Sequence, residues 1–131
     1  MQLSKGKLKK IAKKYGLNLV VLFGSSVTSP KLKPPGDIDL AVRKTTVLAS
    51  EEEISLIEEL SLIFPQEIDV TFINEADSVL IYEIARDGEP LYEAEPYGFL
   101  NFQIYATKVS EDDRRYRELT KKYVLQPEKK W

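Results

Sequence analysis

The chain contains no cysteine and no histidine among its 131 residues. Without cysteine there is no disulfide framework, no thiolate metal site and no cysteine nucleophile. Without histidine, Ser-His-Asp catalysis, histidine-ligated zinc and a histidine general base are excluded together. Any chemistry must therefore rest on carboxylates, hydroxyls, lysine, arginine or a bound metal. The lack of cysteine also fits a reducing compartment.

Long hydrophobic runs are missing as well. The longest unbroken apolar stretch is Leu19 to Phe23, which is far too short to cross a bilayer. The lysine-rich segment before it superficially resembles a signal peptide, but Asn18 interrupts the short apolar core. The segment "KLKKIAKKYG" fits better as a helix that ends at Gly16. We therefore expect a cytoplasmic protein with no membrane partner.

The charges are divided unevenly along the chain, although the net charge is only −2. Residues 1–14 carry only lysine among the charged types, whereas residues 51–95 are strongly acidic, with Arg86 as the sole base. Proteins that bind nucleic acid through their overall charge are normally basic, so this composition argues against direct nucleic-acid binding.

Helical and strand-like patterns alternate along one domain-sized chain. The patterns predict a helix from Ser4 to Gly16, strands at 17–23, 37–42 and 67–73, helices over 50–64 and 76–86, an edge strand at 89–93, and a helical end from Pro96 to about Leu125. A further helical turn is expected at 25–29. This order predicts an α/β or α+β fold: a small mixed sheet of three to four strands flanked by helices. Residues 1–94 would form the core and 95–131 a helical extension.

Local signals add detail to these elements. Ser50 and Glu53 fit a capping box for the second helix. The link between residues 23 and 37 is too short for a helical crossover, so the first two strands are expected to be antiparallel neighbours. The residues expected to face inward are Ile54, Ile57, Leu60 and Phe64 in the second helix, and Phe99, Phe102, Tyr105, Tyr116, Leu119 and Tyr123 in the helical end.

Two aspartates open the second predicted strand. Asp37 and Asp39 share one strand face, about 6.6 Å apart at about 3.3 Å per residue. Carboxylates at this spacing repel each other but can converge on cations, and Mg²⁺ prefers such oxygen ligands. If the third strand lies beside the second, Asp69 completes a cluster of three carboxylates.

A Gly-Ser turn ends the first predicted strand. Gly24 allows the backbone to approach a phosphate closely, and Ser25 or Ser26 can then hold the terminal oxygens of a triphosphate. The chain has no Walker-type phosphate loop. Each signal also has a plainer interpretation: a solvent-facing strand for the aspartate pair, a surface residue for Asp69, and an ordinary turn for Gly24. The three signals together, in this order along the chain, are much less expected by chance than any one of them alone.

The segment "GSSVTSPKLKPPGDIDLAV", followed by "EIDVTFI", resembles the signature of the polymerase-beta-type nucleotidyltransferase superfamily. It is most similar to the minimal nucleotidyltransferase (MNT) proteins, and "EIARDGEPLYEAEP" and the helical end resemble the C-terminal part of MNT antitoxins. The spacer between Ser25 and Asp37 is one residue longer than usual. The arginine that often follows Gly-Ser is also absent, so Lys31 or Lys33 are the candidates for its phosphate contact.

This resemblance implies a fold and an activity. It implies a nucleotidyltransferase-like fold and transfer of AMP from ATP to a hydroxyl acceptor. Catalysis and metal binding would fall to Asp37, Asp39 and Asp69, with two Mg²⁺ ions (or Mn²⁺ in their place), and nucleotide binding to Gly24, Ser25 and Ser26. MNT proteins are commonly partnered with HEPN ribonuclease toxins, so the implied acceptor is a tyrosine of such a toxin.

Two other functions stay open at this point. The first is a binding module that keeps the fold and neutralises a partner by covering it. The second is nucleotidyl transfer to a small hydroxylated molecule, which would need an acceptor pocket completed by a second subunit.

Overall fold

The computed structural model describes residues 3–24 and 37–123, apart from the side chains of Asp37 and Tyr123. Four strands form one mixed sheet in the order β3-β2-β1-β4. The strands are β1 (Leu17–Phe23), β2 (Asp37–Lys44), β3 (Glu67–Phe72) and β4 (Glu89–Glu93). β1 is antiparallel to β2 and β4, whereas β2 and β3 are parallel. The mixed sheet, the antiparallel first pair and the edge position of β4 confirm the predictions from sequence.

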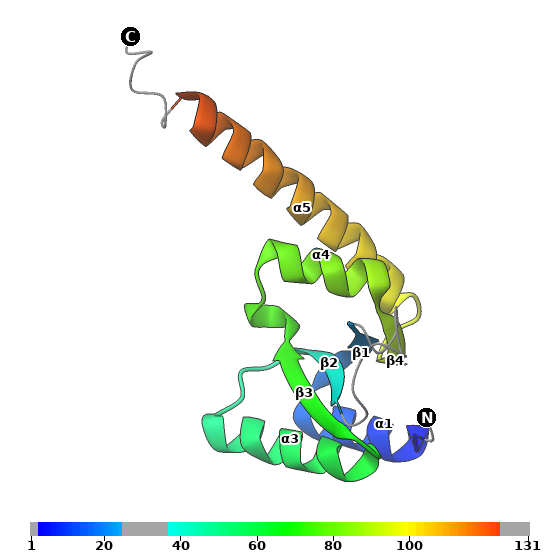
Figure 1. Cartoon of the computed structure of the whole chain (residues 1–131). Coiled ribbons are helices and arrows are strands. Elements are labelled where there is room, and N and C mark those ends of the chain that lie inside the picture. Colours follow the sequence, from blue (N-terminus) through cyan, green and yellow to red (C-terminus); the bar gives the residue numbers. More distant parts are fainter. Residues whose placement is uncertain (1–2, 25–36, 124–131) are drawn as a thin grey trace.

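Helices cover both faces of this sheet (Figure 1). α1 (Lys5–Tyr15) and α3 (Ser50–Ile63) pack on the face that carries Leu40, whereas α4 (Ser78–Asp87) and α5 (Gly98–Tyr123) pack on the face that carries Ala41. β1 contributes buried side chains to both clusters, which explains its near-continuous apolar sequence. No helix of residues 3–24 and 37–123 has the length and apolar character that a membrane span requires.

The ends of α1 follow the predicted capping residues. The Ser4 hydroxyl accepts a hydrogen bond from the Lys7 amide at 3.3 Å. At the other end Gly16 adopts a left-handed conformation, with φ +68°, and its amide bonds back to the last turn of the helix. The turn places Gly16 directly before β1, so helix and strand are joined without a loop.

The predicted capping box of α3 is wrong by one position. Ala49 is the N-cap, and its amide donates to Glu52 Oε1 at 2.9 Å. Glu53 instead pairs with Lys44 Nζ at 2.8 Å, which ties the helix start to the end of β2. The buried face of the helix consists of Leu56, Leu60 and the following Phe64, whereas Ile54, predicted to face inward, is exposed.

α4 begins two residues later than predicted, because Asp77 caps it. The Asp77 carboxylate accepts from the Leu80 amide at 2.8 Å. A 3₁₀ turn, Ile73–Glu75, fills the space between β3 and this cap.

The helical end is a single helix, and half of its predicted inward face is exposed. Phe99 and Phe102 are buried as predicted, but Tyr105, Tyr116 and Leu119 are exposed. For Tyr116 and Leu119 the reason is length: α5 has 26 residues and α4 only 10, or about 39 Å against about 15 Å. α5 therefore continues past the body of the protein (Figure 1). The predicted inward placement of Tyr123 concerns a side chain outside the described residues.

The two glycines of the α1 region should respond oppositely to alanine. Nothing lies within 4 Å of a Cβ built on Gly6, so Gly6→Ala should stabilise the fold by about 0.5–1 kcal/mol through helix propensity. Gly16→Ala should destabilise it by about 1–2 kcal/mol, because of the left-handed φ. Urea denaturation of both variants checks this pair. Equal midpoints for the two variants would contradict the capping role of Gly16.

Candidate active site

The parallel pairing of β2 and β3 places two of the predicted site residues side by side. Asp39 lies opposite Asp69, and Asp37 lies opposite Glu67. Neighbouring strands are about 4.8 Å apart, and residues in register point to the same face of the sheet. Asp39 is half-buried and Asp69 is exposed. The sheet therefore presents two carboxylates to solvent at the beginning of these strands.

β1 brings Gly24 directly onto this pair. Phe23 is the register partner of Asp39, and Gly24 follows with φ +84°. A Cβ built on Gly24 would lie 2.3 Å from Asp39 Oδ2. Glycine is required here for two reasons: the left-handed backbone and the absence of space beside the carboxylate. Gly24 was selected from sequence for phosphate binding, and its contact with Asp39 is an additional role that sequence reasoning missed.

The face of β2 that carries Asp39 becomes more buried further along the strand. Ala41 shares this face and belongs to the buried cluster that includes Ile81, Ile84 and Ala85 of α4. Asp39 is only half-buried, and Asp69 beside it is exposed. The aspartates therefore lie at the margin of the packed core.

The carboxylates suit a hard cation in their chemistry. Asp39 and Asp69 supply oxygen ligands from adjacent strands, which is the donor type that Mg²⁺ prefers. Within residues 3–24 and 37–123, no three acidic side chains converge closely enough to hold a metal. The side chain of Asp37 is not among those described, so the three-carboxylate cluster stays a prediction.

The remaining predicted site residues fall in one segment. Ser25, Ser26, Lys31 and Lys33, together with the helical turn expected at 25–29, lie outside the described residues. Gly24 is thus the one predicted nucleotide-binding residue whose surroundings are described.

Lys44, at the far end of β2, is a basic residue with a structural role. Its Nζ lies 2.8 Å from Glu53 and 3.3 Å from Glu75, and its side chain is only 10% exposed. The hydrogen bond to Glu53 is the main cause that raises the pKa of Lys44. The side chain of Asn74 forms two hydrogen bonds with the Lys44 backbone. Its Oδ1 accepts from the Lys44 amide and its Nδ2 donates to the Lys44 carbonyl, both at 2.9 Å. This lysine ties β2 to the segments that follow it.

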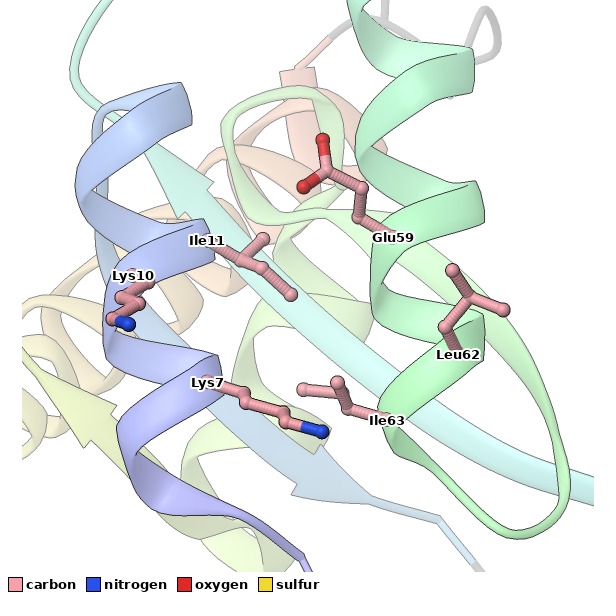
Figure 2. Close-up of a pocket in the computed structure, with 6 residues that line it drawn as sticks. All are labelled: Lys7, Lys10, Ile11, Glu59, Leu62 and Ile63. Carbon is pink, nitrogen blue, oxygen red and sulfur yellow. The ribbon is translucent and has the colours of Figure 1, made fainter.

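A cavity of about 330 Å³ lies between α1 and α3 (Figure 2). Its lining residues are Lys7, Lys10, Ile11, Glu59, Leu62 and Ile63. These helices cover the Leu40 face of the sheet, whereas Asp39 points to the opposite face. The groove is therefore not an extension of the candidate active site.

Comparison with protein families agrees with the site. The model of the family described as polymerase beta, nucleotidyltransferase matches residues 6–97. The chain therefore belongs to the polymerase beta nucleotidyltransferase family. No curated protein matches the sequence.

Solved structures similar to the chain come from toxin–antitoxin systems. A toxin–antitoxin structure with AMP-PNP has a TM-score of 0.70 at 21% identity, covering 94% of this chain and 99% of that one. An MntA–HepT toxin–antitoxin structure has a TM-score of 0.65 at 20% identity, covering 92% and 96%. A tri-AMPylated HEPN toxin in complex with its MNT antitoxin, from Shewanella oneidensis, has a TM-score of 0.65 at 20% identity, covering 92% and 95%. At these identities the similarity establishes a shared fold.

The contact between Gly24 and Asp39 can be tested by adding one methyl group. Gly24→Ala should destabilise the fold by about 1–2 kcal/mol from the positive φ alone, and it should displace the Asp39 carboxylate. Denaturant unfolding and the amide resonances of β2 provide the two measurements. Gly6→Ala is the matched control, because its Cβ meets nothing. An unchanged midpoint together with an unchanged Asp39 resonance would refute the contact.

Proposed function

We propose that the chain is a metal-dependent nucleotidyltransferase that moves AMP from ATP to a hydroxyl acceptor. The observation that carries this proposal is the register of Asp39 with Asp69, with Gly24 against Asp39, in a chain of the nucleotidyltransferase family. Asp37, Asp39 and Asp69 would hold Mg²⁺. When bound, this ion neutralises the triphosphate and stabilises the leaving pyrophosphate.

The reaction exchanges one bond to the α-phosphorus for another. The acceptor oxygen forms a bond to the α-phosphorus, the bond from that phosphorus to the bridging oxygen breaks, and pyrophosphate leaves. The hydroxyl proton must pass to a base, and no histidine is present. We assign this proton to Asp69, whose exposed carboxylate a large acceptor can reach. Gly24 would bring the backbone close to the phosphates, with Ser25 and Ser26 supplying hydroxyl donors.

The acceptor we propose is a tyrosine of a HEPN ribonuclease toxin, which makes the chain an antitoxin. Two of the similar structures support this choice: one contains AMP-PNP and the other a tri-AMPylated HEPN toxin. The acidic segment 51–95 is also compatible with docking on a basic, RNA-degrading partner through electrostatic steering.

Replacing the aspartate pair should abolish transfer without unfolding the protein. With ATP labelled at the α-phosphate, Mg²⁺ and a HEPN protein encoded beside this chain, label should appear on the partner. Asp37→Asn/Asp39→Asn should reduce labelling by at least about a hundredfold, since it removes two of the three proposed metal ligands. The matched control is Asp112→Asn, an exposed aspartate on α5. Full labelling by the double variant would disprove the site assignment.

Neutralisation by binding alone is a second candidate function, and α5 favours it. The outer half of this helix presents Tyr116 at 70% and Leu119 at 56% exposure, without a covering element among the described residues. Exposed aromatic and aliphatic side chains of this kind are typical of protein interfaces. In the same assay, a double-Asn variant that inhibits the toxin fully without labelling it would establish this function.

A further inference from the structure

A second cavity, of about 340 Å³, lies on the α4/α5 face at the far end of β2. Its lining residues are Arg43, Ile73, Asn74, Ala76, Ile81 and Tyr105. Arg43 occupies the same strand face as Asp39, four residues further along, or about 13 Å away at 3.3 Å per residue. The cavity is therefore separate from the candidate active site.

Arg43 is the only basic residue among those that line this cavity, and no counterion pairs with it within residues 3–24 and 37–123. Its Nε donates to Asn18 Oδ1 at 3.0 Å, and its guanidinium lies 5.6 Å from the centre of the Phe102 ring. Among the residues that the structure describes, no carboxylate forms an ion pair with it. By contrast, Arg86 pairs with Asp87 at 2.7 Å. Arg43 is half-buried, and this burial lowers its pKa.

A half-buried guanidinium with no counterion favours the entry of an anion. Desolvation raises the free energy of the charged guanidinium, because burial removes hydrogen bonds from water. An anion that accepts hydrogen bonds from the guanidinium offsets this cost. The bond to Asn18 occupies only one of the five N–H groups of the guanidinium. Asn74 is held by the Lys44 backbone at both its oxygen and its nitrogen, so it forms a fixed wall of the cavity.

The other lining residues specify the body of the ligand. Ile73, Ala76 and Ile81 are apolar, and Tyr105 at the rim offers an aromatic face and a phenol that can donate a hydrogen bond. The volume lies within the range of small-molecule sites, about 300–1,000 Å³. It is also about ten times the volume of a water molecule, about 30 Å³, so a bare inorganic anion would leave it mostly unfilled.

We propose that this cavity binds a small organic anion, a phosphate or carboxylate group attached to an aromatic or apolar body. Arg43 holds the anionic group, Tyr105 donates a second hydrogen bond, and the body packs on Ile73, Ala76 and Ile81. This site is separate from that of the proposed nucleotidyl transfer, since Arg43 lies about 13 Å from Asp39 along β2 at 3.3 Å per residue.

Titration with simple probes, followed by protein NMR, tests the site. Phenyl phosphate and benzoate represent the two anionic groups, and inorganic phosphate represents the anion without a body. The titrations are done in EDTA without nucleotide, so that the metal-dependent site contributes nothing. We expect phenyl phosphate or benzoate to bind saturably, shifting resonances of Asn18, Arg43 and Tyr105. Inorganic phosphate should bind at least about threefold more weakly, since it lacks the body.

Matched arginine variants decide which charge is responsible. Arg43→Gln should weaken binding by at least about tenfold, the loss expected for a charge-assisted hydrogen bond. Arg86→Gln is the control, because Arg86 also lies over an aromatic ring, that of Tyr82, but is already paired. Tyr105→Phe, at an exposed position, gives a second readout that does not disturb the core, and it should weaken binding about threefold. No saturable binding by either organic probe, or equal losses in the two arginine variants, would overturn the proposal.

Discussion

The central constraint of this structure is the position of β2 between an antiparallel and a parallel neighbour. The parallel partner, β3, begins at the same end of the sheet, which sets Asp69 beside Asp39. The antiparallel partner, β1, ends there, which delivers Gly24 to the same carboxylate. With one parallel and one antiparallel neighbour, the start of β2 lies between the start of β3 and the end of β1. The link between β1 and β2 is too short for a helical crossover, so these two strands pair in antiparallel orientation.

Much of the fold could be predicted from sequence, because local signals and tertiary packing agree there. Ser4 and Gly16 delimit α1 through hydrogen bonds within their own turn. The alternation through Ile38 and Asp39 is the pattern of a strand whose neighbouring residues point to opposite faces, and Ile38 is buried as this pattern predicts. These signals depend on neighbours in sequence, so distant residues do not change their meaning.

Several of the failed predictions depend on distant partners. Glu53 was assigned to a helix cap but pairs with Lys44, nine residues earlier on another element. Tyr116 and Leu119 were predicted to face inward. Both side chains are exposed, because this part of α5 extends beyond the other elements that the structure describes. Within the site, the cluster of Asp37, Asp39 and Asp69 was predicted from the order of elements along the chain. The contact between Gly24 and Asp39 was not predicted, because it depends on strand register and on a φ angle that the sequence does not specify. Arg43 was missed because the predicted strand ended at residue 42, one position before it.

The same strand face explains why the charges are arranged as they are. Positions 39, 41 and 43 of β2 share the face of the sheet on which α4 and α5 pack. Ala41, in the middle, is fully buried, whereas Asp39 and Arg43 are half-buried. Asp39 and Arg43 lie about 13 Å apart at 3.3 Å per residue, which is too far for an ion pair. Oxygen ligands suited to a cation therefore gather at the start of β2, at Asp39 and Asp69, and a guanidinium suited to an anion lies near the end of the strand, at Arg43.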